Sequence, residues 1–195
     1  GQRAAGHSRD RLDRVGRLIG GLQSLGVGRS DRFAMMCLNN AEFLELYHAA
    51  FLGGGIANPL NLRFAPRELA YVLRDSGTKV CFVDAAFAGL IDQVKDDAGL
   101  EHVVLIGQGD VPHTARYEDL LVASPMVIPD EGKETDPVVL MYTGGTTGLP
   151  KGVLHHQRAE LLNVYHLLAG IGPREHIVNL LQTPMFHGAS IFSAL

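Results

Sequence analysis

Short apolar runs alternate with helical patterns along most of this chain, and this alternation constrains its fold more than any other feature. The apolar runs, with one extended segment among them, fall at 33–38, 56–60, 80–83, 102–106 and 138–142. Runs of this length are typical of strands that are buried on both faces of a sheet. Because helical patterns separate them, the sequence predicts an α/β protein with a layered α/β/α fold and a largely parallel sheet.

The helical patterns begin close to the first residue. Leu12, Val15, Leu18 and Leu22 recur at intervals of three and four residues, which is the period of an amphipathic helix. Helices are predicted at 9–26, 41–52, 66–76, 86–97, 117–122 and 157–169. Residues 107–116 and 125–137 are predicted connectors, and a strand at 177–181 is followed by a helical start after Pro184.

Composition excludes several classes of protein. Among 195 residues, 17 are basic and 21 acidic, and a net charge of −4 gives no electrostatic footprint for nucleic acid. No run reaches the roughly 18 apolar residues of a membrane span. Cys37 and Cys81 lie inside apolar runs, which predicts buried, reduced thiols in a cytoplasmic protein. Tyr47 and His48 lie on a helix that is apolar nearly all round, which favours core packing over ligation.

The most informative stretch is the loop after the apolar run at 138–142, which reads Y-T-G-G-T-T-G-L-P-K-G-V from Tyr142 to Val153. Its glycines let backbone N–H groups approach a ligand closely. Its threonines add hydroxyl donors, and Lys151 adds a positive charge. Together these groups suit a polyphosphate, which offers many anionic oxygens. The sequence predicts that this loop follows a strand and precedes a helix.

Two other interpretations of the loop fit less well. A Walker-type loop, G-x-x-x-x-G-K-[ST], would start at Gly145, but Pro150 then replaces a glycine and Gly152 replaces the Ser or Thr. Proline removes an N–H that would face phosphate, and Gly152 lacks the hydroxyl that would hold magnesium. A flexible turn without a ligand does not explain three threonines, a proline and a lysine placed among the glycines.

The loop resembles the signature of the adenylate-forming (AMP-binding) superfamily, which includes acyl-CoA synthetases, luciferases and peptide-synthetase adenylation domains. Many members read Y-T-S-G-T-T-G-x-P-K-G, and Gly144 stands at their serine, a form familiar among fatty acyl-CoA synthetases. Residues 39–43 are similar to the family's Asn-Ser-x-Glu-Phe helix start, and residues 53–61 to its Gly-Ala-x-x-x-Pro-x-Asn segment. Residues 183–187 resemble the Pro-x-Phe-His motif that approaches the carboxylate substrate.

The resemblance implies a two-step reaction. A carboxylic acid, with a fatty acid as the leading candidate, attacks ATP to give acyl-adenylate and pyrophosphate. A thiol, usually that of coenzyme A, then displaces AMP. The cofactors and partners implied are ATP with Mg²⁺, coenzyme A and the small-molecule acid. Donors aimed at the β- and γ-phosphates would relieve the charge that builds up there.

The resemblance also assigns the site residues. The catalytic candidates are Lys151, His187 and Thr143, with His187 placed near the reacting carboxylate. The nucleotide-binding candidates are Thr143, Gly144, Gly145, Thr146, Thr147, Gly148 and Lys151. His155 and His156 suit either a phosphate contact or a helix start. His155, His156, His166 and His176 have no carboxylate or cysteine at a matching spacing, so no metal site is predicted. In the family, the magnesium ligand is a Glu that lies further along than residue 195.

We expect residues 1–195 to be a partial N-terminal AMP-binding domain. The first residue is not Met, and residues 191–195 stop in an apolar run without a stop signal. The family's later motifs and its small C-terminal domain are absent, so the piece alone is expected to be inactive. The sequence is compatible with a homo-oligomer. It is also compatible with two other functions: an adenylation domain of a peptide synthetase, and a non-catalytic module that binds a nucleotide or an acyl group. Gly144 and the Pro-Met-Phe-His stretch favour an acyl-CoA synthetase.

Overall fold

A computed structural model describes residues 2–125, 127, 132–144, 148–172, 180–188 and 190. It contains one 7-stranded sheet with the order β5-β4-β3-β1-β2-β6-β7. The strands are β1 (Arg32–Met36), β2 (Ile56–Pro59), β3 (Val80–Asp84), β4 (His102–Ile106), β5 (Ala115–Arg116), β6 (Pro137–Thr143) and β7 (Lys151–His156). Neighbouring strands run parallel except β6 and β7, which pair antiparallel. The predicted, largely parallel sheet is confirmed.

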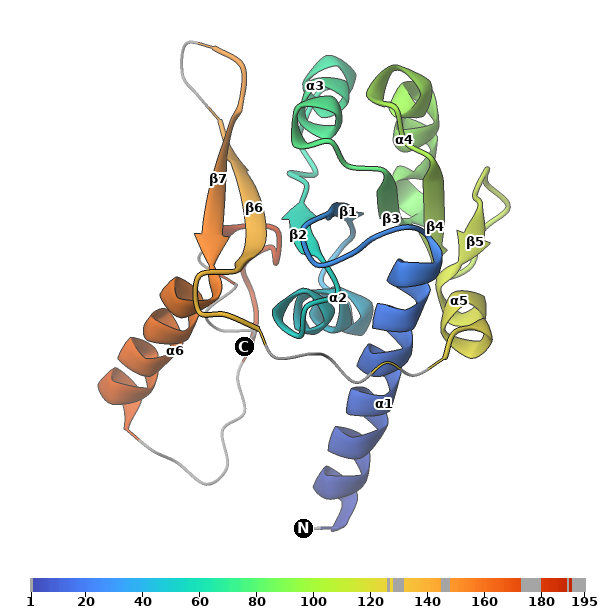
Figure 1. Cartoon of the computed structure of the whole chain (residues 1–195). Helices are drawn as coiled ribbons and strands as arrows, with labels where there is room; N and C mark the ends of the chain where they lie inside the picture. The colour runs from blue at the N-terminus through green and yellow to red at the C-terminus, as the bar shows by residue number, and fades with distance from the viewer. Residues whose placement is uncertain are drawn as a thin grey trace.

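Helices cover both faces of this sheet, as Figure 1 shows. They are α1 (Gln2–Ser24), α2 (Ala41–Phe51), α3 (Pro66–Ser76), α4 (Ala85–Ala98), α5 (Tyr117–Ala123) and α6 (Gln157–Ile171). Helices α3 and α4 pack on one face, and α1, α2 and α5 pack on the other. The predicted three-layer arrangement is therefore confirmed. None of the helices in the described part of the chain has the length and apolarity that a bilayer crossing requires.

Alternation along the strands divides the core into two layers. Phe33 and Met35 face α1 and α2, whereas Ala34 and Met36 face α3 and α4. This is the period of two that a strand imposes on its side chains. Both cysteines are buried and free, as predicted, and burial raises the pKa of the Cys81 thiol to about 12. Each large apolar side chain that is fully buried stabilises the fold by about 1.5–3 kcal/mol.

Local sequence explains where several elements begin. The side-chain oxygen of Asn40 accepts a hydrogen bond from the Phe43 N–H at 2.8 Å and so caps α2. Pro66 lies in the first turn of α3, where its missing N–H costs nothing. Gly55 has φ +128°, and a Cβ there would lie 2.9 Å from Val27 Cγ1, so only glycine lets the chain turn into β2 beside β1.

The structure corrects three expectations. No strand is predicted between the loop after β6 and the helix at 157–169, but Lys151–His156 forms β7 against β6; the helix itself begins at Gln157, as predicted. The predicted loop 107–116 ends in the short strand β5. Helix α1 begins at Gln2 rather than at residue 9. The predicted strand at 177–181 lies mostly outside the described residues, and Leu180 and Leu181 are not in a strand.

Candidate active site

The candidate site lies at the carboxyl ends of the parallel strands. The order of β5 through β2 is that of a doubly wound sheet, in which ligands bind outside this edge. The segments that follow β1, β2 and β6 all line cavities there. The turn at residues 184–188, far along the chain, completes the same cavities.

The first cavity has a volume of about 440 Å³ and is bounded by the hairpin of β6 and β7. Its lining includes Thr143, Gly144, Val153, His155, Phe186 and His187. None of the described residues around it is acidic. The cavity therefore offers hydroxyl, backbone and imidazole groups without a carboxylate that would repel an anion.

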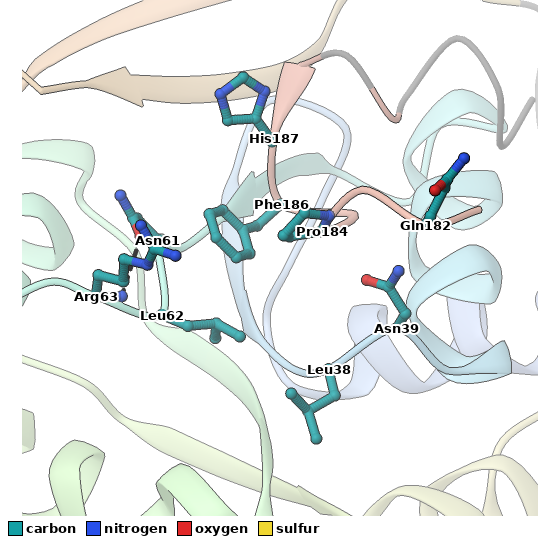
Figure 2. Close-up of a pocket in the computed structure, with 9 residues that line it drawn as sticks. All are labelled: Leu38, Asn39, Asn61, Leu62, Arg63, Gln182, Pro184, Phe186 and His187. Carbon is teal, nitrogen blue, oxygen red and sulfur yellow. Dashed lines mark hydrogen bonds between the residues drawn. The ribbon is translucent and has the colours of Figure 1, made fainter.

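The second cavity is larger, at about 870 Å³. Figure 2 shows the nine residues that line it, which come from the ends of β1 and β2 and from the turn that carries His187. It shares Asn61, Phe186 and His187 with the first cavity. His187 lines both cavities, so it stands where they meet, and its side chain is exposed. Its backbone N–H donates to the Pro184 carbonyl at 3.0 Å, which closes the turn.

The hairpin places two predicted site residues opposite each other. Thr143 pairs with Lys151 across the strands, and the Thr143 hydroxyl donates to the Lys151 carbonyl at 3.4 Å. Both side chains are exposed, so both are accessible to a ligand. Gly144 has no atom within 4 Å of the place where a Cβ would stand, which leaves its backbone open to a ligand. Gly148 is exposed, while Gly145, Thr146 and Thr147 lie outside the described residues.

A tyrosine near the loop end of the hairpin joins it to α3. The Tyr142 hydroxyl donates to Asp75 Oδ2 at 2.6 Å, and burial together with this carboxylate raises the pKa of the phenol. Gly152 faces Tyr142 across the strands, and a Cβ there would lie 3.2 Å from the tyrosine ring. The glycine after Lys151 thus leaves room for the ring. Tyr71, Asp75 and residues 148–152 line a third cavity of about 580 Å³. Sequence reasoning missed Asp75, because nothing local links it to Tyr142.

The two adjacent histidines of β7 have different partners. His155 Nδ1 lies 2.6 Å from Glu160 Oε1, and Glu160 is fully buried. His156 Nδ1 lies 2.7 Å from the Thr135 carbonyl, and His156 precedes α6 without capping it through its side chain. Of the two, His155 faces the first cavity. Neither histidine belongs to a group of three metal-ligating side chains within the described residues.

The groups present fit the phosphates of a nucleotide. The exposed Lys151, the Thr143 hydroxyl and the open backbone of Gly144 lie at the loop end of the β6–β7 hairpin. These are the donors that anionic phosphate oxygens require. The described residues do not supply a carboxylate cluster for magnesium, so we assign no residue to that ion.

A doubly wound sheet, extended by a hairpin with a Gly/Thr/Lys loop and faced by a Pro-x-Phe-His turn, defines an α/β protein of the adenylate-forming class. The sequence matches the family of AMP-binding enzymes over residues 9–195, and the chain belongs to that family.

Named relatives agree with this membership. The chain is 35% identical over 181 residues to 4-hydroxybutyrate–CoA ligase 2 of Metallosphaera sedula, covering 87% of this chain and 33% of the relative. It is 34% identical over 185 residues to the long-chain-fatty-acid–CoA ligase of Thermus thermophilus, covering 89% and 32%. The inhibitor-bound N-terminal domain of FACL13 from Mycobacterium tuberculosis superposes with a TM-score of 0.79 at 29% identity, covering 95% of this chain and 46% of that one. The chain thus spans about a third of the length of the curated relatives it matches.

Proposed function

We propose that the whole protein is an ATP-dependent acid–thiol ligase, which converts a carboxylic acid to its acyl-adenylate and transfers the acyl group to coenzyme A. Residues 1–195 form a partial N-terminal AMP-binding domain in this proposal, and alone they do not complete the reaction. One observation carries it: His187 stands between two cavities, and the first of them is bounded by the hairpin that bears Thr143 and Lys151.

The hairpin acts on the departing pyrophosphate. An anionic acid must approach a polyanion, and the leaving group gains further negative charge as the bond to the α-phosphorus breaks. Lys151 and the Thr143 hydroxyl lie opposite each other and are exposed, so both can donate to the β- and γ-phosphate oxygens. The backbone of Gly144 adds to these donors. The role extends along the loop to Gly145, Thr146, Thr147 and Gly148.

His187 acts at the other end of the nucleotide. An imidazole between the two cavities can donate a hydrogen bond to the reacting carboxylate or to the adenylate. The acid is proposed to be a fatty acid, because the Gly144 form is shared with fatty acyl-CoA synthetases and because Leu38, Leu62 and Phe186 make part of the second cavity apolar. Magnesium accompanies ATP as its counter-ion, and coenzyme A supplies the thiol. A cytoplasmic location suits the two buried, free cysteines.

An ATP–pyrophosphate exchange assay on the full-length protein tests the first step. Lys151→Ala should slow exchange by about a hundredfold or more, because it removes a donor to the charge that develops on the leaving group. Lys79→Ala is the matched control, since Lys79 is exposed and pairs with Glu101 at 2.8 Å beside the amino end of β3, at the opposite edge of the sheet. An exchange rate that Lys151→Ala leaves unchanged would refute the role of the hairpin.

A further inference from the structure

One asparagine side chain contacts three backbone groups of the segment that leads to His187. Asn39 follows β1, and its side-chain Nδ2 donates to the Thr183 carbonyl at 3.0 Å and to the Leu181 carbonyl at 3.4 Å. Its Oδ1 accepts from the Met185 N–H at 2.8 Å. The amide thus uses its donor and its acceptor on alternate residues of one segment, 181–185. Figure 2 shows this amide directed toward Pro184.

Asn39 is itself held in place from the sheet. Asp84, the last residue of β3, accepts a hydrogen bond from the Leu38 N–H at 2.6 Å. This bond joins the turn after β1 to the end of the neighbouring strand. The turn is therefore attached to the sheet through the backbone of the residue before Asn39, which limits where the Asn39 side chain can point.

The other side of Met185 is fixed as well. The Tyr47 hydroxyl, which is buried in α2, donates to the Met185 carbonyl at 2.9 Å. The Met185 side chain is also buried. Leu181 through Pro184 belong to neither a helix nor a strand, so no ladder of backbone hydrogen bonds holds them. Asn39, Tyr47 and the Ser190 hydroxyl, which donates to the Pro184 carbonyl at 2.9 Å, supply bonds that a ladder would otherwise give. His187 follows Met185 by two residues.

We propose that Asn39 is a positioning residue for His187, acting through the backbone of residues 181–185. This inference rests on the proposed adenylation function. Its physical basis is that catalytic groups tolerate little displacement: a misplacement of about 1 Å can cost a factor of 100 in rate. Loss of the amide frees three backbone groups of the segment, and the imidazole is then held less precisely between the two cavities, because the Tyr47 bond to Met185 alone does not fix residues 181–183.

The experiment compares two adjacent asparagines in the full-length protein. Asn39→Ala should lower kcat for pyrophosphate exchange by about 10- to 100-fold. Asn40→Ala is the matched control, because Asn40 caps α2 and donates to Asp84 Oδ1 at 3.1 Å, whereas the Leu38 N–H bonds the other oxygen, Oδ2, and none of the Asn40 bonds reaches residues 181–185. We expect this control to lower the thermal midpoint and to keep kcat. Asn39→Ala with the kcat of the wild type would overturn the proposal.

A second measurement reports on the contact without activity. Hydrogen exchange of the Met185 amide should accelerate by about tenfold or more in Asn39→Ala, because its acceptor is gone, and should stay unchanged in Asn40→Ala. Unchanged exchange in Asn39→Ala would also overturn the proposal. If the wild-type protein failed to exchange pyrophosphate, the proposed function would fall, while the Met185 amide would still test the contact.

A double variant separates positioning from direct contact with the acid, since Asn39 also lines the second cavity. In a His187→Ala background, Asn39→Ala should add little further loss, because both changes remove the same contribution. Losses that multiply, or a change confined to the KM for the acid, would show that Asn39 acts on the substrate and would reject the inference. If Asn39→Ala does not fold, Asn39→Asp replaces it in the kcat comparison. Aspartate keeps the shape of the side chain but lacks the Nδ2 donor, so a kcat equal to that of the wild type would contradict the proposal.

Discussion

The two halves of this sheet differ in how they are packed. Strands β1 to β4 are almost entirely buried between two layers of helices. Five of the six residues of β7 are exposed, and α6 exposes several large apolar side chains. The candidate nucleotide-binding residues nevertheless lie on the hairpin, while the buried half supplies the turns that face it.

The difference in burial between β1 to β4 and β7 suggests that the two halves contribute differently to stability and to ligand binding. A tightly packed half can hold loop residues in fixed places, because its strands and helices leave little freedom for adjustment. Strand β7 can change its position when a ligand binds, since its exposed residues make few buried contacts, although Val138, Val139 and Leu140 keep β6 in the core. Substitutions in the buried core of the first half should therefore act on unfolding, and those of exposed residues near the loop end of the hairpin mainly on the proposed nucleotide step.

The largest expected effect tests this contrast directly. Phe82→Ala should lower the free energy of unfolding by about 3–5 kcal/mol, because Phe82 is fully buried and meets Phe33 and Tyr117 edge to face. Leu154→Ala on β7 should cost only about 0.5–1 kcal/mol, since its side chain is 50% exposed. Urea unfolding of both variants, followed by circular dichroism, gives the comparison. Equal losses would mean that the hairpin packs as tightly as the buried half.

The buried half could be predicted from sequence because its signals are local. Phe33 to Met36 form a run short enough for a strand, Asn40 is a good N-cap, and Pro66 and Gly77 bound a helix. Each of these depends on neighbours within a few residues of the chain. The same is true of the Gly/Thr/Lys loop, whose residue types by themselves indicate a phosphate ligand.

Strand β7 and the support of the candidate site could not be predicted, because both depend on distant residues. Lys151–His156 does not alternate between polar and apolar, and it becomes a strand only by pairing with β6. The contact of Asn39 with Met185 spans 146 residues, and that of Tyr142 with Asp75 spans 67. The structure brings Thr143 and Lys151 together and sets His187 beside the same cavity, but the binding roles of all three stay predictions.

A smaller effect is expected where the two halves are joined. Tyr142→Phe removes the hydroxyl that donates to Asp75 and should cost about 0.5–1.5 kcal/mol of unfolding free energy. In a double-mutant cycle with Asp75→Ala, we expect a coupling energy of about 0.5–1 kcal/mol, because the two groups share one bond. Tyr71→Phe is the matched control, since its hydroxyl lies 3.4 Å from Asp75, close to the limit for a hydrogen bond.

The same variants also show whether α3 supports the hairpin during the reaction. If Tyr142→Phe also slows pyrophosphate exchange in the full-length protein while Tyr71→Phe does not, α3 holds the hairpin in its working position. A coupling energy of zero would mean that this hydrogen bond does not support the hairpin, which is then held by the β2–β6 pairing and by the core packing of Val138 and Val139.

The smallest expected effect concerns His48, which lies between α1 and α2 in the buried half and lines a cavity of about 340 Å³ with Arg11 and Leu12. Burial, and then the charge of Arg11, lower the pKa of this imidazole from 6.5, although Glu45 opposes the shift. The folded state thus disfavours the proton, so His48 adds stability above the unfolded pKa and loses it as the pH falls through the lower, folded pKa. His48→Gln should therefore flatten the decline in the urea midpoint between about pH 7.5 and pH 5.5. His166→Gln is the control, because His166 is exposed on α6, and it should not flatten the decline. Equal slopes of the urea midpoint against pH in the wild type and both variants would show that burial does not lower the pKa of His48.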